Sequence, residues 1–179
     1  SLCESDPVLT MNKTDCGTGG GTAHQMHSVL VVADDERLRD VLTSLVDSFG
    51  YDVDTAADSE EALDRLDGRS TDIALCDVNM PGQSGVWLAS QIREHHPHTA
   101  VIMTTGGTDI GNTIVSLRND VVDYLFKPFD GRRLQEALRL GVDWHRAVVA
   151  ADQLQDSLEH RLRHRRAAVA AALAGVQPT

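Results

Sequence analysis

The stretch D-I-A-L-C-D-V-N-M-P-G-Q-S-G at residues 72–85 decides the fold of this chain. Its first half is an apolar run of Ile, Ala, Leu and Cys, which is typical of a fully buried strand and which ends on the carboxylate of Asp77. Its second half is rich in Pro and Gly and predicts the turn that follows the strand. Asp77 therefore stands at the carboxyl end of a strand, and in open α/β sheets ligands collect in the crevice outside those ends.

Strand patterns recur along the chain and alternate with helical patterns. We expect four further strands, at 29–33, 51–56, 100–105 and 121–126, of which 51–56 is predicted from its alternation of polar and apolar residues. Apolar residues at 3-4 spacing and helix-start signals predict helices over 37–49, 59–66, 86–95 and 109–117, and a last helix from Leu134 onward. Solid apolar strands that alternate with helices predict an α/β fold, a doubly wound five-stranded parallel sheet with an extended C-terminal helix.

Length and charge restrict the possible partners. With 179 residues the chain is long enough for one well-packed domain and an appendage. Its 27 acidic and 16 basic residues give a net charge of −11, which argues against nonspecific binding to nucleic acid or to an anionic membrane. Residues 1–129 hold 21 acidic and 8 basic residues, whereas residues 130–179 hold 6 and 8. This shift predicts a change of role near residue 130.

The number of cysteines and the lengths of the apolar runs indicate the cellular compartment. Three scattered cysteines, Cys3, Cys16 and Cys76, favour a reduced intracellular protein over a disulfide-bonded one. No apolar run approaches the ~20 residues of a membrane span, and no signal-peptide pattern opens the chain. We therefore expect a cytoplasmic location and no membrane partner, by default.

Three segments are predicted. Residues 1–27 lack periodicity and are expected to be a disordered leader, and the absence of an initiator Met is consistent with a vector remnant. Residues 28–142 carry the α/β pattern. Residues 143–179 are expected to form a helical extension, a signalling helix or weak coiled coil, because a heptad lasts scarcely two repeats before Arg161 and Arg165 fall on its seam. The arginines alternate with Ala and Leu, which favours a solvated face over direct nucleic-acid binding.

The predicted sheet gathers polar residues at one edge. These residues, which follow the first, third, fourth and fifth strands, are Asp34, Asp35, Asp77, Thr105 and Lys127. Three carboxylates at close range repel one another unless a cation is present, and hard oxygen ligands suit Mg²⁺. A lysine and a hydroxyl facing that metal would supply donors to a phosphoryl group, and Asp77 is the plausible nucleophile of an acyl phosphate.

Four blocks of sequence carry a family resemblance. They are D-D-E at 34–36, D-V-N-M-P-G-Q-S-G at 77–85, M-T-T-G at 103–106 and D-Y-L-F-K-P-F at 123–129. In this order and spacing they resemble the receiver domain of two-component response regulators, although each block alone is a weak signal. The resemblance implies the flavodoxin-like fold of receivers and a phosphoryl group taken from a phosphohistidine on a histidine kinase or phosphotransfer protein.

The resemblance also implies a role for each matching position. Asp77 is similar to the phosphoacceptor, Lys127 to its phosphate partner and Thr105 to the switch hydroxyl. Asp35 and the backbone carbonyl of Asn79 correspond to direct Mg²⁺ ligands, Asp34 corresponds to a ligand through water, and Asp77 itself completes the expected metal set. Tyr124 corresponds to the aromatic residue that changes rotamer, and the Lys127-Pro128 bond is expected to be cis.

Output and activity follow as expectations. The face made by helix 109–117, strand 121–126 and the last helix is expected to control association or an output partner, with a homodimer through that face or the C-terminal helix. The chain is expected to catalyse only its own phosphorylation and dephosphorylation.

Two alternative functions stay open. A haloacid-dehalogenase-like phosphatase needs a second Asp where Asn79 stands, and a degenerate receiver used for docking is disfavoured because all five polar positions are occupied.

Overall fold

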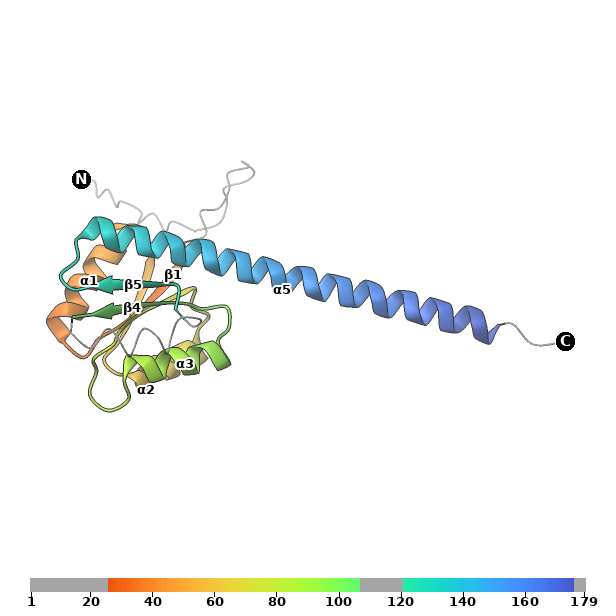
Figure 1. The fold of residues 1–179 in the computed structure, drawn as a ribbon, viewed down its shortest axis with the longest axis horizontal. Helices are drawn as coiled ribbons and strands as arrows, with labels where there is room; N and C mark the ends of the chain where they lie inside the picture. Colours follow the sequence, from red (N-terminus) through yellow and green to blue (C-terminus); the bar gives the residue numbers. More distant parts are fainter. Residues whose placement is uncertain (1–25, 107–120, 176–179) are drawn as a thin grey trace, which may run out of the picture.

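A computed structural model describes residues 26–106 and 121–175 of the chain (Figure 1). The strands are β1 (Ser28–Val32), β2 (Asp52–Ala56), β3 (Ile73–Asp77), β4 (Ala100–Thr105) and β5 (Asp123–Phe126). The helices are α1 (Glu36–Ser48), α2 (Ser59–Gly68), α3 (Gly85–His95) and α5 (Gly131–Ala174). The helix predicted over 109–117 lies outside the described residues.

The five strands form one parallel sheet in the order β2-β1-β3-β4-β5. The chain starts near the middle of the sheet, winds outward to one side and then returns to build the other side, which is the doubly wound topology. The predicted fold class is therefore confirmed. The order sets β3, which carries Asp77, between β1 and β4, so the ends of both neighbours flank the carboxylate.

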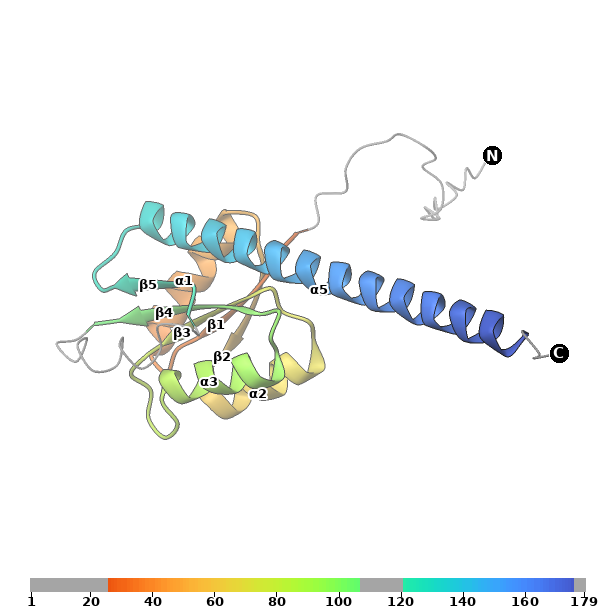
Figure 2. The ribbon, with the colours of Figure 1, turned by 45° about the vertical axis from the view of Figure 1, so that its right-hand side comes forward.

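Helices cover both faces of the sheet. Figures 1 and 2 show α1 and α5 on one face and α2 and α3 on the other. Alternate residues of each strand point to opposite faces and build two separate cores. Leu75 and Ile102, for example, pack with residues of α1 and α5, whereas Cys76 and Met103 pack with residues of α2 and α3. This burial on both faces explains why the strands read as continuous apolar runs.

Acidic and hydroxyl side chains set the starts of the helices. Asp35, Asp58, Ser84 and Asp130 are the N-caps of α1, α2, α3 and α5, and each accepts hydrogen bonds from backbone N–H groups of the first turn. Because Asp130 caps α5, that helix begins at Gly131, three residues before the predicted start. β5 begins two residues later than the apolar run of Val121 and Val122 predicted.

α5 is much longer than the sheet that it covers. Its 44 residues extend over about 66 Å at 1.5 Å per residue, and Figure 1 shows the second half projecting beyond the sheet. At the point of exit, His145 Nε2 lies 3.3 Å from Asp72 Oδ1, and His27 Nδ1 lies 2.8 Å from Asp72 Oδ2. This carboxylate ties α5 to the amino ends of β1 and β3. None of the helices in the described part of the chain is long and apolar enough to span a membrane.

Cys76 is enclosed within the core, as expected for a thiol in a central strand. Burial raises the pKa of the Cys76 thiol to about 12, and the charge of Asp77 adds to the effect. Because only the thiolate reacts readily, Cys76 is expected to resist alkylation in the folded protein at mildly alkaline pH. A Cys3→Ser, Cys16→Ser variant leaves Cys76 as its single thiol, so mass spectrometry after iodoacetamide treatment, with and without denaturant, measures its protection. Rapid alkylation of the native variant would show that β3 is not buried.

The same thiol predicts a pH dependence of stability. The unfolded thiol loses its proton near its ordinary pKa of 9.0, whereas the folded thiol keeps it up to about 12. The free energy of unfolding should therefore fall as the pH rises between these values, because the unfolded state then binds fewer protons. A Cys76→Ala variant should lack this contribution.

Candidate functional site

Asp77 is the centre of the site. It ends β3 and is only 5% exposed, and its carboxylate is held from two sides. The Lys127 ammonium forms an ion pair with Oδ2, and the backbone N–H of Asn79 donates to Oδ1 at 3.2 Å. A buried carboxylate needs such partners because desolvation disfavours its charge. The structure thus brings Asp77 and Lys127, which are 50 residues apart in sequence, into direct contact.

Lys127 is positioned by its own backbone. Its N–H donates to the carbonyl of Thr105 at 2.7 Å, which continues the ladder between β4 and β5 by one residue. The Lys127-Pro128 bond is cis. A Cβ atom on Gly106 would lie 3.5 Å from Lys127 Cδ, so the lysine stem runs directly over this glycine. Lys127 therefore leaves the sheet edge in a fixed place and reaches across β4 to Asp77.

Two adjacent threonines end β4, and strand alternation separates them. Met103 packs in the core beneath α2 and α3, so Thr105, two residues on, belongs to the same face. Thr104 shares the opposite face with Ile102. Both threonines are buried, and the Thr104 hydroxyl has no hydrogen-bond partner among the described residues. The two hydroxyls are therefore not interchangeable.

Asp34 and Asp35 follow β1 at the same edge of the sheet. Val32 is in register with Cys76, so the chain after β1 continues beside Asp77. Both aspartates are exposed, and Asp35 Oδ1 accepts hydrogen bonds from the N–H groups of Arg37 and Leu38 at 2.9 and 3.1 Å. Among the residues described, no group of three or more His, Cys, Asp or Glu side chains is placed to hold a metal ion. The carboxylate oxygens of Asp34, Asp35 and Asp77 are the type of ligand that Mg²⁺ prefers. One oxygen of Asp35 caps α1, and one oxygen of Asp77 pairs with Lys127.

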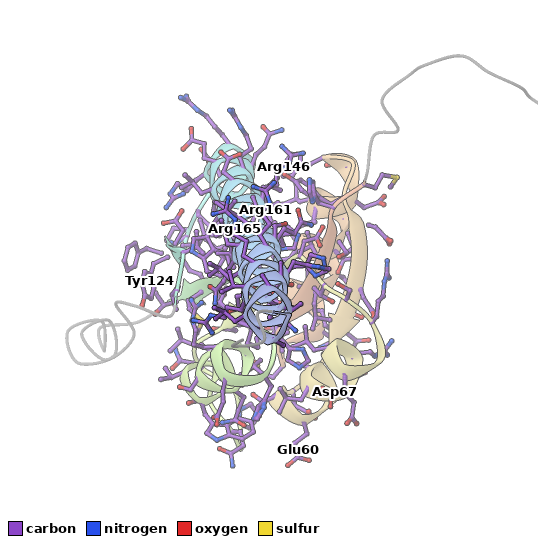
Figure 3. All side chains as sticks on the ribbon, turned by 90° about the vertical axis from the view of Figure 1, so that its right-hand side faces the viewer. Glu60, Asp67, Tyr124, Arg146, Arg161 and Arg165 are labelled. Atoms are coloured by element: carbon purple, nitrogen blue, oxygen red, sulfur yellow. The ribbon has the colours of Figure 1, made fainter. Side chains whose placement is uncertain are left out.

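Tyr124 is linked to α5 through its backbone. The guanidinium of Arg133 pairs with Asp123, with Nη1–Oδ2 at 2.8 Å and Nη2–Oδ1 at 2.9 Å, and also donates to the Tyr124 carbonyl at 3.1 Å. This pairing raises the pKa of Arg133. The Tyr124 ring packs against the core beneath α2 and α3, and Figure 3 shows it at the β5 edge of the sheet. A movement of Tyr124 would therefore reach the first turn of α5.

Two further positions support the site and were not identified from the sequence. Gly85 was predicted only as part of a turn, but it begins α3 directly against the Asp77 peptide, where an added Cβ would lie 2.0 Å from the Asp77 carbonyl oxygen. Ser59 was predicted to open a helix, which it does, but its buried hydroxyl also donates to the carbonyl of Gln83 at 2.8 Å. The Ser59–Gln83 contact joins residues 24 apart, and the Gly85 contact depends on how the loop after β3 folds back, so the sequence pattern reveals neither.

Comparison with known proteins agrees with this geometry. The model of the response regulator receiver domain family matches residues 29–139. The transcriptional regulatory protein CpxR of Escherichia coli (strain K12) is 35% identical over 114 residues, which cover 64% of this chain and 48% of CpxR. The DNA-binding transcriptional regulator NtrC of the same strain is 35% identical over 112 residues, which cover 63% of this chain and 23% of NtrC. The chain thus spans about half the length of CpxR and about a quarter of NtrC.

Solved structures share the fold. A CheY-like receiver domain from Methanospirillum hungatei JF-1 has a TM-score of 0.64 and 27% identity, with 69% of this chain and 98% of that chain covered. The response regulator TrrA from Thermotoga maritima, in complex with Mg(2+)-BeF, has a TM-score of 0.60 and 29% identity, with 65% and 99% covered.

The fold and the site define a doubly wound α/β protein with a buried carboxylate–lysine pair at its strand ends. The family match covers more than half of the sequence and makes the assignment specific. This chain belongs to the response regulator receiver domain family, and the resemblance inferred from its sequence is confirmed. It is a signalling domain of the kind that its transcription-regulating relatives carry.

Proposed function

We propose that this chain accepts a phosphoryl group on Asp77 from a histidine kinase or a phosphotransfer protein, in a Mg²⁺-dependent reaction. The observation that carries the proposal is the buried Asp77 carboxylate, paired with Lys127 at the carboxyl edge of the sheet. Family membership supports the same reading, and TrrA was solved with Mg(2+)-BeF. The boundaries proposed for this unit are 28–142, with 143–179 as its helical extension and a cytoplasmic location.

The chemistry follows from the groups at the strand ends. A carboxylate oxygen of Asp77 attacks the phosphorus of the donor phosphohistidine, the new O–P bond forms as the N–P bond breaks, and the imidazole leaves and regains a proton from solvent. Lys127 then donates to the phosphoryl oxygens, and the Thr105 hydroxyl supplies a further donor from β4. Asp34, Asp35 and the Asn79 carbonyl would hold Mg²⁺, whose charge offsets that of the phosphoryl oxygens. Water later hydrolyses the acyl phosphate and restores the carboxylate.

The proposed output is a shift between two conformations. The phosphoryl group adds about −1.5 to −2 charges at the strand ends, which favours a state in which Thr105 approaches the phosphoryl oxygens. Tyr124 then turns into the space left on the same face of the sheet. Because Arg133 contacts both Asp123 and the Tyr124 carbonyl, the change reaches α5. The face that includes β5 and α5 would then control self-association or an output partner.

Phosphoryl uptake from a small phosphodonor tests this function. Intact mass of the wild type should increase by one phosphoryl group with Mg²⁺ and should not change with excess EDTA. Thr105→Ala should alter the lifetime of the phosphorylated form, whereas Thr104→Val should not, because Thr104 lies on the opposite face of β4. No uptake by the folded wild type would reject the phosphoacceptor function and leave the docking module as the remaining candidate.

A further inference from the structure

The second half of α5 has an uncovered apolar stripe. Every described residue from Ala150 to Gly175 is exposed. The stripe includes large apolar side chains that are 50% to 70% exposed: Leu154, Leu158, Leu162, Val169 and Leu173. An isolated helix in water gains little stability from its backbone alone, so a helix of this kind is normally stabilised by packing its apolar side.

The stripe follows an 11-residue repeat. Steps of four, three and four residues connect Ala147, Ala151, Leu154, Leu158, Leu162, Arg165, Val169 and Leu173. This spacing averages about 3.67 residues per turn. A straight α-helix has about 3.6 residues per turn and a heptad repeat about 3.5, so the 11-residue repeat drifts less around the helix. The stripe therefore stays on one side of α5. The 11-residue period describes this stripe over a longer stretch than the heptad predicted from the sequence, which lasts scarcely two repeats. With the longer period, Arg165 is the single charged residue in the stripe.

Charge is separated along the same stretch. Residues 152–159 contain three acidic residues, Asp152, Asp156 and Glu159, and no lysine or arginine. Residues 160–175 contain four arginines and no acidic residue. Figure 3, which looks along α5 from its C-terminal end, shows Arg161 and Arg165 on the same side of the helix. The exposed helix therefore has an acidic segment followed by a basic one.

We propose that this exposed part of α5 pairs with the same part of a second copy of the chain in an antiparallel orientation. Parallel pairing would place Arg165 against its own copy and bring acidic segment against acidic segment. Antiparallel pairing places the basic segment of each copy against the acidic segment of the other, which is the complementary arrangement.

The stripe and the charges together fix the register of this pairing. When residues 152–159 of one copy lie opposite residues 161–168 of the other, the acidic segment faces all four arginines, and Glu159 lies opposite the second copy's Arg161. In the same register Leu158 lies opposite Leu162, and Ala151 lies opposite Val169. About 21 residues of the exposed part overlap, which corresponds to roughly 32 Å of helix. The two sheets then lie at opposite ends of the paired helices.

This pairing does not depend on the proposed phosphoryl chemistry. α5 begins beside the carboxyl edge of the sheet, where Asp77 lies, and leaves the sheet at the amino edge, where His145 contacts Asp72. The exposed stripe is thus remote from Asp77. The association and the phosphoacceptor function can therefore fail separately.

Sedimentation of the full chain measures the association. The wild type should sediment as a dimer at micromolar concentration, and Leu158→Asp should sediment as a monomer. Ser157→Asp adds the same charge at the next position but off the stripe, so it should remain dimeric. A monomeric wild type would overturn the proposal, as would a Leu158→Asp variant that associates like the wild type.

Disulfide cross-linking determines the orientation. In a Cys3→Ser, Cys16→Ser background, a tagged Ala151→Cys chain is mixed with an untagged Val169→Cys chain and oxidised. Antiparallel pairing predicts mostly the mixed cross-link between the two variants. Cross-links mainly within each variant, as a parallel pair would form, would contradict the proposed orientation even if the chain is dimeric.

Discussion

Replacement of Gly85 by alanine is expected to destabilise the domain by about 3 kcal/mol and to lower phosphoryl uptake at Asp77 roughly 100-fold. The new Cβ would lie 2.0 Å from the Asp77 carbonyl oxygen, 2.8 Å from the carbonyl carbon and 3.0 Å from Met103 Cε. The first two atoms are backbone, so no side-chain rotation relieves the overlap. α3 or the end of β3 must shift, and either change moves the reacting carboxylate.

Gly68→Ala is the matched control for this substitution. Gly68 ends α2, its backbone is not in the left-handed region, and an added Cβ would meet no atom within 4 Å. The free energy of unfolding of the Gly68→Ala variant should equal that of the wild type or exceed it by less than about 1 kcal/mol, because alanine is the better helix former. Urea denaturation of both variants and their rates of phosphoryl uptake give the comparison. Equal stability of the two variants would show that α3 does not contact the Asp77 peptide as described.

Replacement of Lys127 by alanine is expected to have the second-largest effect. It removes the cation from a carboxylate that is almost entirely buried, and this should destabilise the domain by about 2 kcal/mol at neutral pH. Phosphoryl uptake should fall roughly 100-fold, because a positioned donor to the phosphoryl oxygens is lost. Arg132→Ala removes the same charge at an 85% exposed side chain and should change stability by less than about 1 kcal/mol.

A double-mutant cycle separates the ion pair from other effects of the substitution. The cycle compares Lys127→Ala, Asp77→Asn and the double variant by chemical denaturation. If the two groups interact as the structure describes, the coupling free energy should be about 2 kcal/mol. Strictly additive effects would mean that the ion pair contributes nothing to the stability of the folded state.

The sequence was sufficient for the fold because the sheet is buried on both faces. Apolar runs that end in polar residues predicted the central strands, and an alternating pattern predicted β2. The ends of β1, β3, β4 and β5 predicted which polar groups share an edge. The proximity of Asp77 and Lys127 was expected from that topology, whereas their direct ion pair is seen only in the structure. The start of β5 was predicted less well, because the apolar residues Val121 and Val122 come before the first strand residue, Asp123.

Other features depend on contacts that no local pattern records. Gly85 reads as a turn glycine, and only its approach to the Asp77 peptide explains why a side chain cannot stand there. No sequence pattern marks Arg133, yet its guanidinium pairs with Asp123 at the start of β5. In each case the partner is supplied by the three-dimensional fold.

The most direct test of the central claim is intact mass spectrometry of the wild type and Asp77→Asn after incubation with Mg²⁺ and a small phosphodonor. Both proteins should first be shown to be folded, by circular dichroism and by a cooperative thermal transition. The wild type is predicted to gain the mass of one phosphoryl group, and Asp77→Asn is predicted to gain none. Equal labelling of the two proteins would contradict the assignment of Asp77 as the phosphoacceptor.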